Sequence, residues 1–213
     1  MFNSVTQFIV LSLKDFAYRN WLFFRHIPIY FTCPRLLIVD SLLFVFRVFY
    51  SLPRLLKAYP PYLLYGEISY KGLHKLLRQL PLSSDSTLVD LGCGLGKLLF
   101  FCRSYYHFNC IGVEINATYC RVARFLKTIL CYRKLSVIHA DFSTITLPKG
   151  DVYVVSGTCF DEATLNILSK RFNDQGSIYV ISLSTPLPNT SLDLIATETI
   201  ACSWGFATVY LYH

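Results

Sequence analysis

Charged residues are scarce in this chain: only 15% of its 213 residues are charged, whereas globular domains usually have about 25%. Hydrophobic residues make up 54% and aromatic residues 16%. This composition excludes a disordered tail protein, a collagen-like repeat and a solvated coiled coil. The length predicts one sizeable domain with an appendage, and apolar residues are abundant enough to form a large core.

The eight cysteines form no C-x-x-C pair, and no cluster of Cys and His has the spacing of a zinc site. We therefore expect no metal centre. The cysteines are interpreted as small buried hydrophobic residues of a protein in a reducing compartment.

The body of the chain also lacks a strong excess of basic charge. Residues 1–60 hold seven Lys/Arg and two Asp/Glu, a net charge of +5. Residues 61–213 hold thirteen and eleven, a net charge of only +2. A nucleic-acid-binding body would need a basic face of its own, so no nucleic-acid partner is predicted.

No charge-free run in the amino-terminal segment is long enough to span a membrane, and no secretory signal precedes it. The most apolar stretch, Leu36 to Pro53, is interrupted by Asp40 and Arg47, each costly at a bilayer centre. Residues 1–60 are thus predicted to be a helical, basic segment. They form either an apolar lid on the main domain, residues 61–213, or an anchor in the membrane interface. A true membrane span is the third and least favoured alternative. The expected location is cytoplasmic, with a peripheral position on the inner face of a membrane as one alternative.

The body of the chain alternates between short apolar runs and amphipathic segments. Continuous apolar runs are typical of strands buried on both faces, so we expect a parallel sheet covered by helices. The sequence predicts an α/β fold with a doubly wound, mostly parallel, Rossmann-like sheet of seven strands that ends in an antiparallel hairpin. The expected strands are 87–91, 110–113, 136–139, 151–156, 177–183, 194–202 and 206–211; the expected helices are 69–80, 96–106, 116–134 and 160–172.

The clearest motif follows the first strand: Asp90, Gly92, Cys93, Gly94 and Gly96 lie in the sequence DLGCGLG. Glycines here allow a tight turn and bring a ligand against bare amides and a helix amino terminus. The D-x-G-x-G-x-G spacing differs from the G-x-G-x-x-G of dinucleotide sites, which disfavours a nicotinamide dehydrogenase. It is typical of S-adenosylmethionine (SAM) pockets.

Two further carboxylates end the next two strands. Glu114 lies twenty-four residues after Asp90, where a carboxylate can accept both ribose hydroxyls. Asp141 and Phe142 end the third strand, where a carboxylate can bind the adenine amino group and an aromatic ring can stack on adenine. The carboxyl ends of parallel strands share one edge of the sheet, so we expect these residues to line one pocket.

These motifs, VDLGCGLG, Gly112-Val113-Glu114 and Ala140-Asp141-Phe142, resemble those of class I SAM-dependent methyltransferases over roughly residues 60–213. The sequence Leu64-Tyr65-Gly66-Glu67 upstream resembles the non-SET histone lysine methyltransferases of the disruptor-of-telomeric-silencing type. The resemblance implies SAM as cofactor. It also implies that Tyr65 and Glu67 belong to a loop that closes over the methionyl part of the cofactor.

The acceptor is less clearly indicated. That family has two asparagines and two aromatic residues after the fourth strand, whereas this chain has Ser156-Gly157-Thr158-Cys159-Phe160. Ser156 and Phe160, with Tyr65 and Glu67, are the candidate catalytic residues at the acceptor channel. The apolar amino terminus is also similar to that of the membrane-associated lysine methyltransferases of ATP synthase subunits. We therefore expect a protein lysine acceptor; a small-molecule or lipid acceptor, or a non-catalytic module that binds SAM, are the alternatives.

Overall fold

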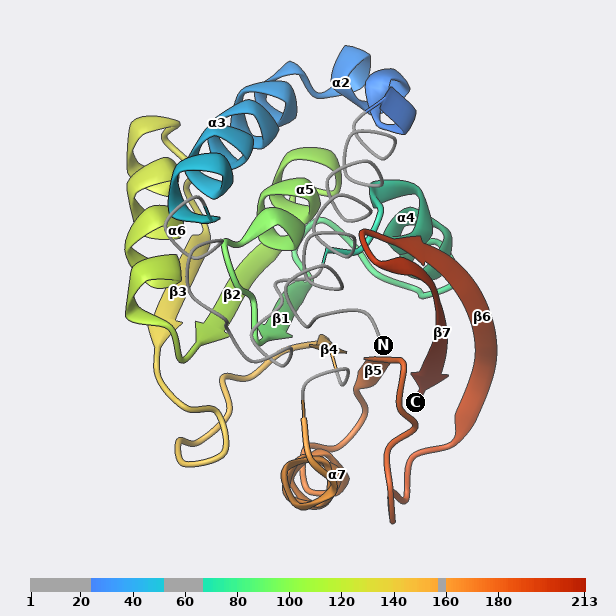
Figure 1. Ribbon diagram of the computed structural model, residues 1–213. Helices are drawn as coiled ribbons and strands as arrows, with labels where there is room; N and C mark the ends of the chain where they lie inside the picture. The colour runs from blue at the N-terminus through green and yellow to red at the C-terminus, as the bar shows by residue number, and fades with distance from the viewer. Residues whose placement is uncertain (1–23, 52–66, 157–159) are drawn as a thin grey trace, which may run out of the picture.

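The computed structural model describes residues 24–51, 67–156 and 160–213, and its centre is a seven-stranded sheet (Figure 1). The strand order is β3-β2-β1-β4-β5-β7-β6. The first five of these strands are parallel, and β7 and β6 continue the sheet as an antiparallel hairpin. The predicted sheet and its terminal hairpin are thus confirmed. The strands are β1 (Thr87–Leu91), β2 (Asn109–Glu114), β3 (Leu135–His139), β4 (Val152–Ser156), β5 (Tyr179–Leu183), β6 (Leu194–Cys202) and β7 (Gly205–Tyr212).

Helices cover both faces of the sheet. Leu88, Cys110 and Val154 point into the core under α4, α5 and α6, whereas their neighbours Val89 and Val155 point into the core under α7. Figure 1 shows α7 on the side of the sheet opposite to these three helices. Because both faces are covered, the inner strands need the continuous apolar runs that the sequence shows. The helices are α4 (Tyr70–Leu77), α5 (Lys97–Tyr105), α6 (Ala117–Ile129) and α7 (Glu162–Asn173).

Side-chain caps fix where three of these helices begin. Ser69 accepts a hydrogen bond from the amide of Gly72 at the start of α4, and Asn116 accepts from the first amides of α6. Both caps agree with the predicted helix starts. At α7 the cap is Asp161, so that helix begins at Glu162, and Phe160 lies outside it. A capping carboxylate satisfies amides that lack a partner in the first turn, which explains this later start.

The end of α6 corrects the sequence prediction. The helix was expected to run to Lys134, but it ends at Ile129 in a Schellman motif. The amide of Cys131 donates to the carbonyl of Thr128, and the amide of Tyr132 donates to that of Lys127. Cys131 takes the left-handed position of the motif with φ of 52°. Glycine usually occupies this position, so its absence here hid the helix end.

Two amino-terminal helices, α2 (Ile27–Thr32) and α3 (Pro34–Ser51), lie outside α5 (Figure 1). Leu36, Val39 and Leu43 of α3 are fully buried in the same core as α5. Within residues 24–51, 67–156 and 160–213, no helix combines the length and apolarity needed to cross a bilayer. The predicted domain boundary after residue 60 lies outside the described residues.

The order of the strands defines where a ligand is expected. The chain runs outward from β1 to β2 and β3 on one side, and from β4 to β5 on the other. In open α/β sheets, ligands bind outside the carboxyl ends of the strands where this direction reverses. Here that point lies between the ends of β1 and β4, next to the glycine-rich turn that leads into α5.

Candidate cofactor site

The glycine-rich turn between β1 and α5 has the backbone geometry that the motif predicts. Gly92, Gly94 and Gly96 all have positive φ, at 85°, 55° and 79°. The motif predicted that the amides of this turn are free to bind a ligand, but the amides of these glycines already have acceptors within the protein. Gly92 and Cys93 both donate to the carbonyl of Val113, and Gly96 donates to the carbonyl of Cys93. The turn is therefore held to β2 by its own backbone, and its amides shape the pocket more than they offer free donors.

Cys93 packs the turn against β2. A Cβ atom added at Gly112 would lie 2.5 Å from Cys93 Sγ and 2.6 Å from Leu99 Cδ1. Gly112 therefore leaves the space that the turn and α5 occupy. Burial, followed by the negative charges of Asp90 and Glu114, raises the pKa of the Cys93 thiol. This cysteine is a neutral packing residue at the pocket.

Asp90 and Glu114 lie on the same face of the sheet, at the carboxyl ends of neighbouring strands. Both are buried, at 4% and 8% exposure. Glu114 accepts two backbone hydrogen bonds, from Gly94 at 2.8 Å and from Asn116 at 2.8 Å. Burial and then the charge of Glu114 raise the pKa of Asp90 to about 8. The structure thus places two of the predicted cofactor residues together, as two buried carboxyl groups beside the glycine turn.

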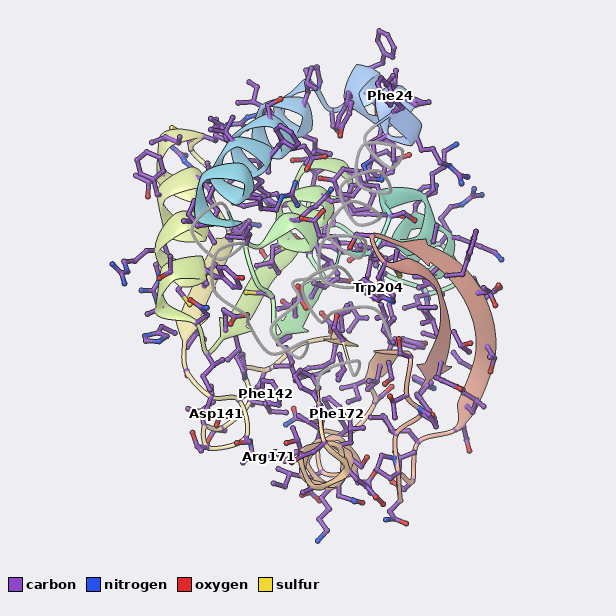
Figure 2. The ribbon with its side chains drawn as sticks, viewed as in Figure 1. Phe24, Asp141, Phe142, Arg171, Phe172 and Trp204 are labelled. Atoms are coloured by element: carbon purple, nitrogen blue, oxygen red, sulfur yellow. The ribbon has the colours of Figure 1, made fainter. Side chains whose placement is uncertain are left out.

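Asp141 and Phe142 lie on the loop after β3, beside Arg171 of α7 (Figure 2). Arg171 donates to the carbonyls of Phe142, Ser143 and Ile145, and so fixes the loop. The Asp141 carboxylate accepts from the amide of Ser143 at 2.8 Å. The ring of Phe142 is buried and meets the ring of Phe160 edge to face, 5.0 Å between centroids.

These contacts bear differently on the two roles predicted at this loop. Asp141 is only partly buried, so its carboxylate is not enclosed in the core, and its binding of the adenine amino group stays a prediction. Phe142 belongs to the core under α7, so its observed role is packing, and its stacking on adenine stays a prediction.

The acceptor side of the site is described only in part. Ser156 ends β4, and the ring of Phe160 reaches the glycine turn: a Cβ added at Gly92 would lie 3.2 Å from Phe160 Cζ. Tyr65 and residues 157–159 lie outside the described residues. Among those described, no group of three or more His, Cys, Asp or Glu is arranged to hold a metal ion.

Glu67 is buried in a cluster of four charges that the sequence motifs did not predict. The members of this charge cluster are Asp40, Arg47, Glu67 and Lys97. The Glu67 carboxylate pairs with Lys97 at 3.0 Å and with Arg47 of α3. Lys97 also lies 3.5 Å from Asp40 of α3. One signal was available: Asp40 and Arg47 interrupt an apolar helix seven residues apart, a spacing that places them on one helix face.

Solved structures similar to this chain are methyltransferases and related proteins of low sequence identity. An RNA methyltransferase from Salinibacter ruber, in complex with S-adenosyl-L-homocysteine, has a TM-score of 0.54 and 17% identity, over 66% of this chain and 88% of its own. MtNAS in complex with MTA and tNA has a TM-score of 0.57 and 16% identity, over 95% of this chain and 75% of its own. These similarities confirm the predicted Rossmann-like methyltransferase fold.

Sequence comparison narrows the family. The H3 lysine-79-specific histone-lysine N-methyltransferase of Drosophila melanogaster is 31% identical to this chain over 120 residues. The match covers 55% of this chain and only 6% of that protein, so the chain corresponds to a small part of this relative. The sequence model of the histone methylation protein DOT1 matches residues 47–191, more than half of the chain. The resemblance inferred from the motifs is thereby confirmed, and the chain belongs to the DOT1 family.

Proposed function

We propose that this protein binds SAM at the carboxyl ends of β1, β2 and β3 and methylates a lysine side chain of a protein substrate. One observation carries the proposal: Asp90 and Glu114 lie together, buried, with Glu114 bonded to the amide of Gly94 in the turn. Membership in the DOT1 family supports the cofactor, and the Drosophila relative, a histone-lysine methyltransferase, supports the lysine acceptor.

The residues of the pocket suit such a cofactor. Glu114 is fixed by two amides, one on each carboxylate oxygen, and each oxygen keeps a lone pair that could accept a ribose hydroxyl. We assign Asp141, on the loop after β3, to accept from the adenine amino group. The cofactor, when bound, would supply an electrophilic methyl group on a sulfonium, whose bonding electron pair stays on sulfur after transfer.

The chain's own contribution is alignment and exclusion of water. Phe160 contacts the glycine turn at Gly92 and so forms a wall between the cofactor pocket and the end of β4. Ser156 lies at that strand end, on the acceptor side. Tyr65 and Glu67 are assigned to the loop over the methionyl part by the family resemblance. With these roles, an acceptor amine would approach between the carboxyl ends of β1 and β4, where the strand order reverses.

A lipid or other membrane-borne acceptor is the second candidate, and one surface favours it. Helices α2 and α3 expose large apolar side chains, among them Phe31 at 83%. The amino-terminal 60 residues carry a net charge of +5, and each basic residue near anionic headgroups contributes about 1 kcal/mol. This surface supports a peripheral, salt-sensitive contact with the negatively charged inner face of a membrane. The other large apolar side chains exposed within residues 24–51 are Phe24, Ile27, Leu37, Ile38, Leu42, Phe44 and Val45.

A transfer experiment separates the two acceptors. The protein is incubated with methyl-labelled SAM and a cell lysate, which is then fractionated into protein, lipid and nucleic acid. We expect label in protein, recovered as methyl-lysine after acid hydrolysis, and none with the Gly94→Val variant. Label in the lipid fraction would favour the second candidate. Tight SAM binding without transfer to any fraction would instead indicate a non-catalytic binding module.

A further inference from the structure

Helix α3 has two unlike faces. Leu36, Val39, Asp40 and Leu43 are buried against the main domain, whereas Leu37, Ile38, Leu42, Phe44 and Val45 are exposed. The exposed side is therefore mostly apolar, with Arg35 and Ser41 as its polar residues, whereas the charged Asp40 is buried. Arg47, one turn after Leu43, is only partly buried and reaches the same domain. An apolar exposed side over buried charge reverses the usual pattern and indicates that Asp40 and Arg47 serve a purpose inside the protein.

Asp40 is held by partners from three other elements. Tyr30 of α2 donates to it at 2.5 Å, and Tyr70 of α4 donates at 2.8 Å. Lys97 of α5 lies 3.5 Å away, and His26 lies 3.9 Å away. Burial alone would raise the pKa of Asp40, but the charge of Lys97 and the hydrogen bonds with His26 and Tyr30 hold it below its usual value. Asp40 is therefore a buried, ionised carboxylate that ties α2, α3, α4 and α5 together.

Arg47 and Lys97 hold Glu67 between them. The Glu67 carboxylate pairs with Arg47 through one oxygen and with Lys97 through the other. Its backbone is fixed as well, because its amide donates to Ser203 Oγ at 3.0 Å and its carbonyl accepts from the amide of Ser203. Lys97 also lies over the ring of Tyr70, 5.0 Å from its centroid. The four charges alternate in sign, in the order Asp40, Lys97, Glu67, Arg47.

This charge cluster lies next to the cofactor site. Lys97 is the first residue of α5 and directly follows Gly96, the last glycine of the turn. Glu67 is the last residue of the Tyr-Gly-Glu sequence assigned to the loop over the cofactor. We propose that Asp40 and Arg47 are positioning residues for cofactor binding: they hold Lys97 and Glu67 in place, so that α3 and the SAM pocket are coupled. The inference rests on the proposed function.

The coupling has to act in both directions. If the position of α3 determines the affinity for SAM, then bound SAM must stabilise α3 by the same free energy. Hydrogen exchange of the full-length chain tests this in the unmodified protein. With saturating S-adenosyl-L-homocysteine as probe, we expect the buried amides of α3 to exchange about threefold or more slowly. Slower exchange confined to the glycine turn and β2, with α3 unchanged, would overturn the inference.

Variants of Arg47 test the same coupling from the other side. Arg47→Met should weaken SAM binding, measured by calorimetry, about tenfold. Kinetically, it should raise KM for SAM while kcat at saturating SAM changes by less than about twofold. Arg47→Lys, which keeps the charge, should restore affinity to within about threefold. Val45→Met places the same residue on the exposed face of the same helix and should bind SAM as the unmodified chain does.

The possible outcomes separate failure of this inference from failure of the proposed function. A folded Arg47→Met variant with unchanged affinity would overturn the coupling and leave the SAM site intact. If Arg47→Met does not fold, the exchange experiment on the unmodified chain still decides. If the unmodified chain does not bind SAM at all, the proposed function fails, and the inference fails with it.

Discussion

The protein buries two pairs of carboxylates on either side of the start of α5, and the two pairs behave in opposite ways. Asp90 and Glu114 lie on the same face of the sheet beside the glycine turn, and the pKa of Asp90 is raised to about 8 by burial and by Glu114. Asp40 and Glu67 are as deeply buried, at 2% and 6% exposure, yet the pKa of Asp40 is lowered. Lys97 and Arg47 alternate with the second pair. At Asp40, burial is outweighed by the charge of Lys97 and by hydrogen bonds with His26 and Tyr30, which accounts for the difference in pKa.

The comparison shows how a binding site differs from a structural ion-pair cluster. A buried charge with its own counter-ions is satisfied within the protein, so it fixes the elements that carry it. Two like charges that share a site disfavour ionisation of both, and such pairs are typical of functional sites. Hydroxyl donors from a ligand would favour the ionised form. On this basis we assign the first pair to the proposed cofactor site and the second pair to holding its surroundings in place.

The largest effect is expected from removing the cation shared by the second pair. Lys97→Met leaves Asp40 without its cation and Glu67 with Arg47 alone. Breaking a buried ion pair on one side costs about 3–5 kcal/mol, so the free energy of unfolding in urea should fall by that amount. Lys97→Arg is the control that keeps the charge. A loss below about 1 kcal/mol would show that the cluster is not structural.

A second substitution checks the reason for that loss. If the instability of Lys97→Met comes from an uncompensated carboxylate, adding Asp40→Asn should recover part of it, because one buried charge is then removed. Additive or greater loss in the double variant would point to packing, not charge, as the cause.

The pH dependence of stability should have opposite signs at the two pairs. The pKa of Asp90 in the folded protein, about 8, is raised above its ordinary 3.8, so its contribution to stability is fully present below about pH 4. That contribution is lost as pH rises through about 8, at a rate on the order of 1 kcal/mol per pH unit. Asp90→Asn should remove this decline in urea unfolding measured between pH 6 and 8.

Around the second pair, lowered pKa values give stability the opposite dependence on pH. Asp40 has its pKa below 3.8, so its contribution is present above that value and lost as pH falls further. The pKa of His26 is lowered from 6.5 by burial, and it destabilises the fold as pH falls below 6.5. Parallel stability curves for the unmodified chain and Asp90→Asn would contradict the assignment at the first pair.

Cofactor affinity should depend on the first pair. Glu114→Ala removes charge-assisted hydrogen bonds to the ribose hydroxyls and should weaken SAM binding by about 1.5–3 kcal/mol, measured by calorimetry. Glu114→Gln keeps the shape of the side chain and loses its charge, so its affinity for SAM should lie between those of the unmodified chain and Glu114→Ala. It should also lower the pKa of Asp90, followed by carboxyl NMR, but leave it above 3.8, because burial is the larger cause of the shift. Unchanged affinity in folded Glu114→Ala would contradict this pocket.

The sequence was sufficient to predict the first pair and the fold around it. Asp90 and Glu114 each end a short apolar strand, and in a parallel sheet all such ends meet at one edge. Local signals also marked the helix starts at Ser69 and Asn116. The predicted end of α6 was wrong, because Cys131 occupies the left-handed position where glycine normally indicates a helix end.

The second cluster could not be predicted in the same way. Its members come from α3, from the segment before α4 and from the start of α5, and only the three-dimensional fold brings them together. In the sequence, Asp40 and Arg47 appear simply as interruptions of an apolar run. The hydrogen bonds of the glycine-turn amides were missed for a similar reason, since their acceptor, the carbonyl of Val113, is a backbone group without a sequence signal.

The smallest effect is expected at an ion pair that belongs to neither pair of buried carboxylates, and it provides the reference for the comparison. Lys75 of α4 pairs with Glu198 of β6 at 2.5 Å, but the lysine side chain is 58% exposed. Exposed pairs contribute about 0–1 kcal/mol, because water screens the charges and two long side chains are held in one geometry. Lys75→Ala should therefore lower the free energy of unfolding by less than about 1 kcal/mol. Adding 0.5 M salt should erase most of that difference, since exposed charges are screened at such ionic strength, while the loss in Lys97→Met should persist. If Lys75→Ala were as damaging as Lys97→Met, burial would not be what distinguishes the ion pairs of this protein, and the role of α3 would need another explanation.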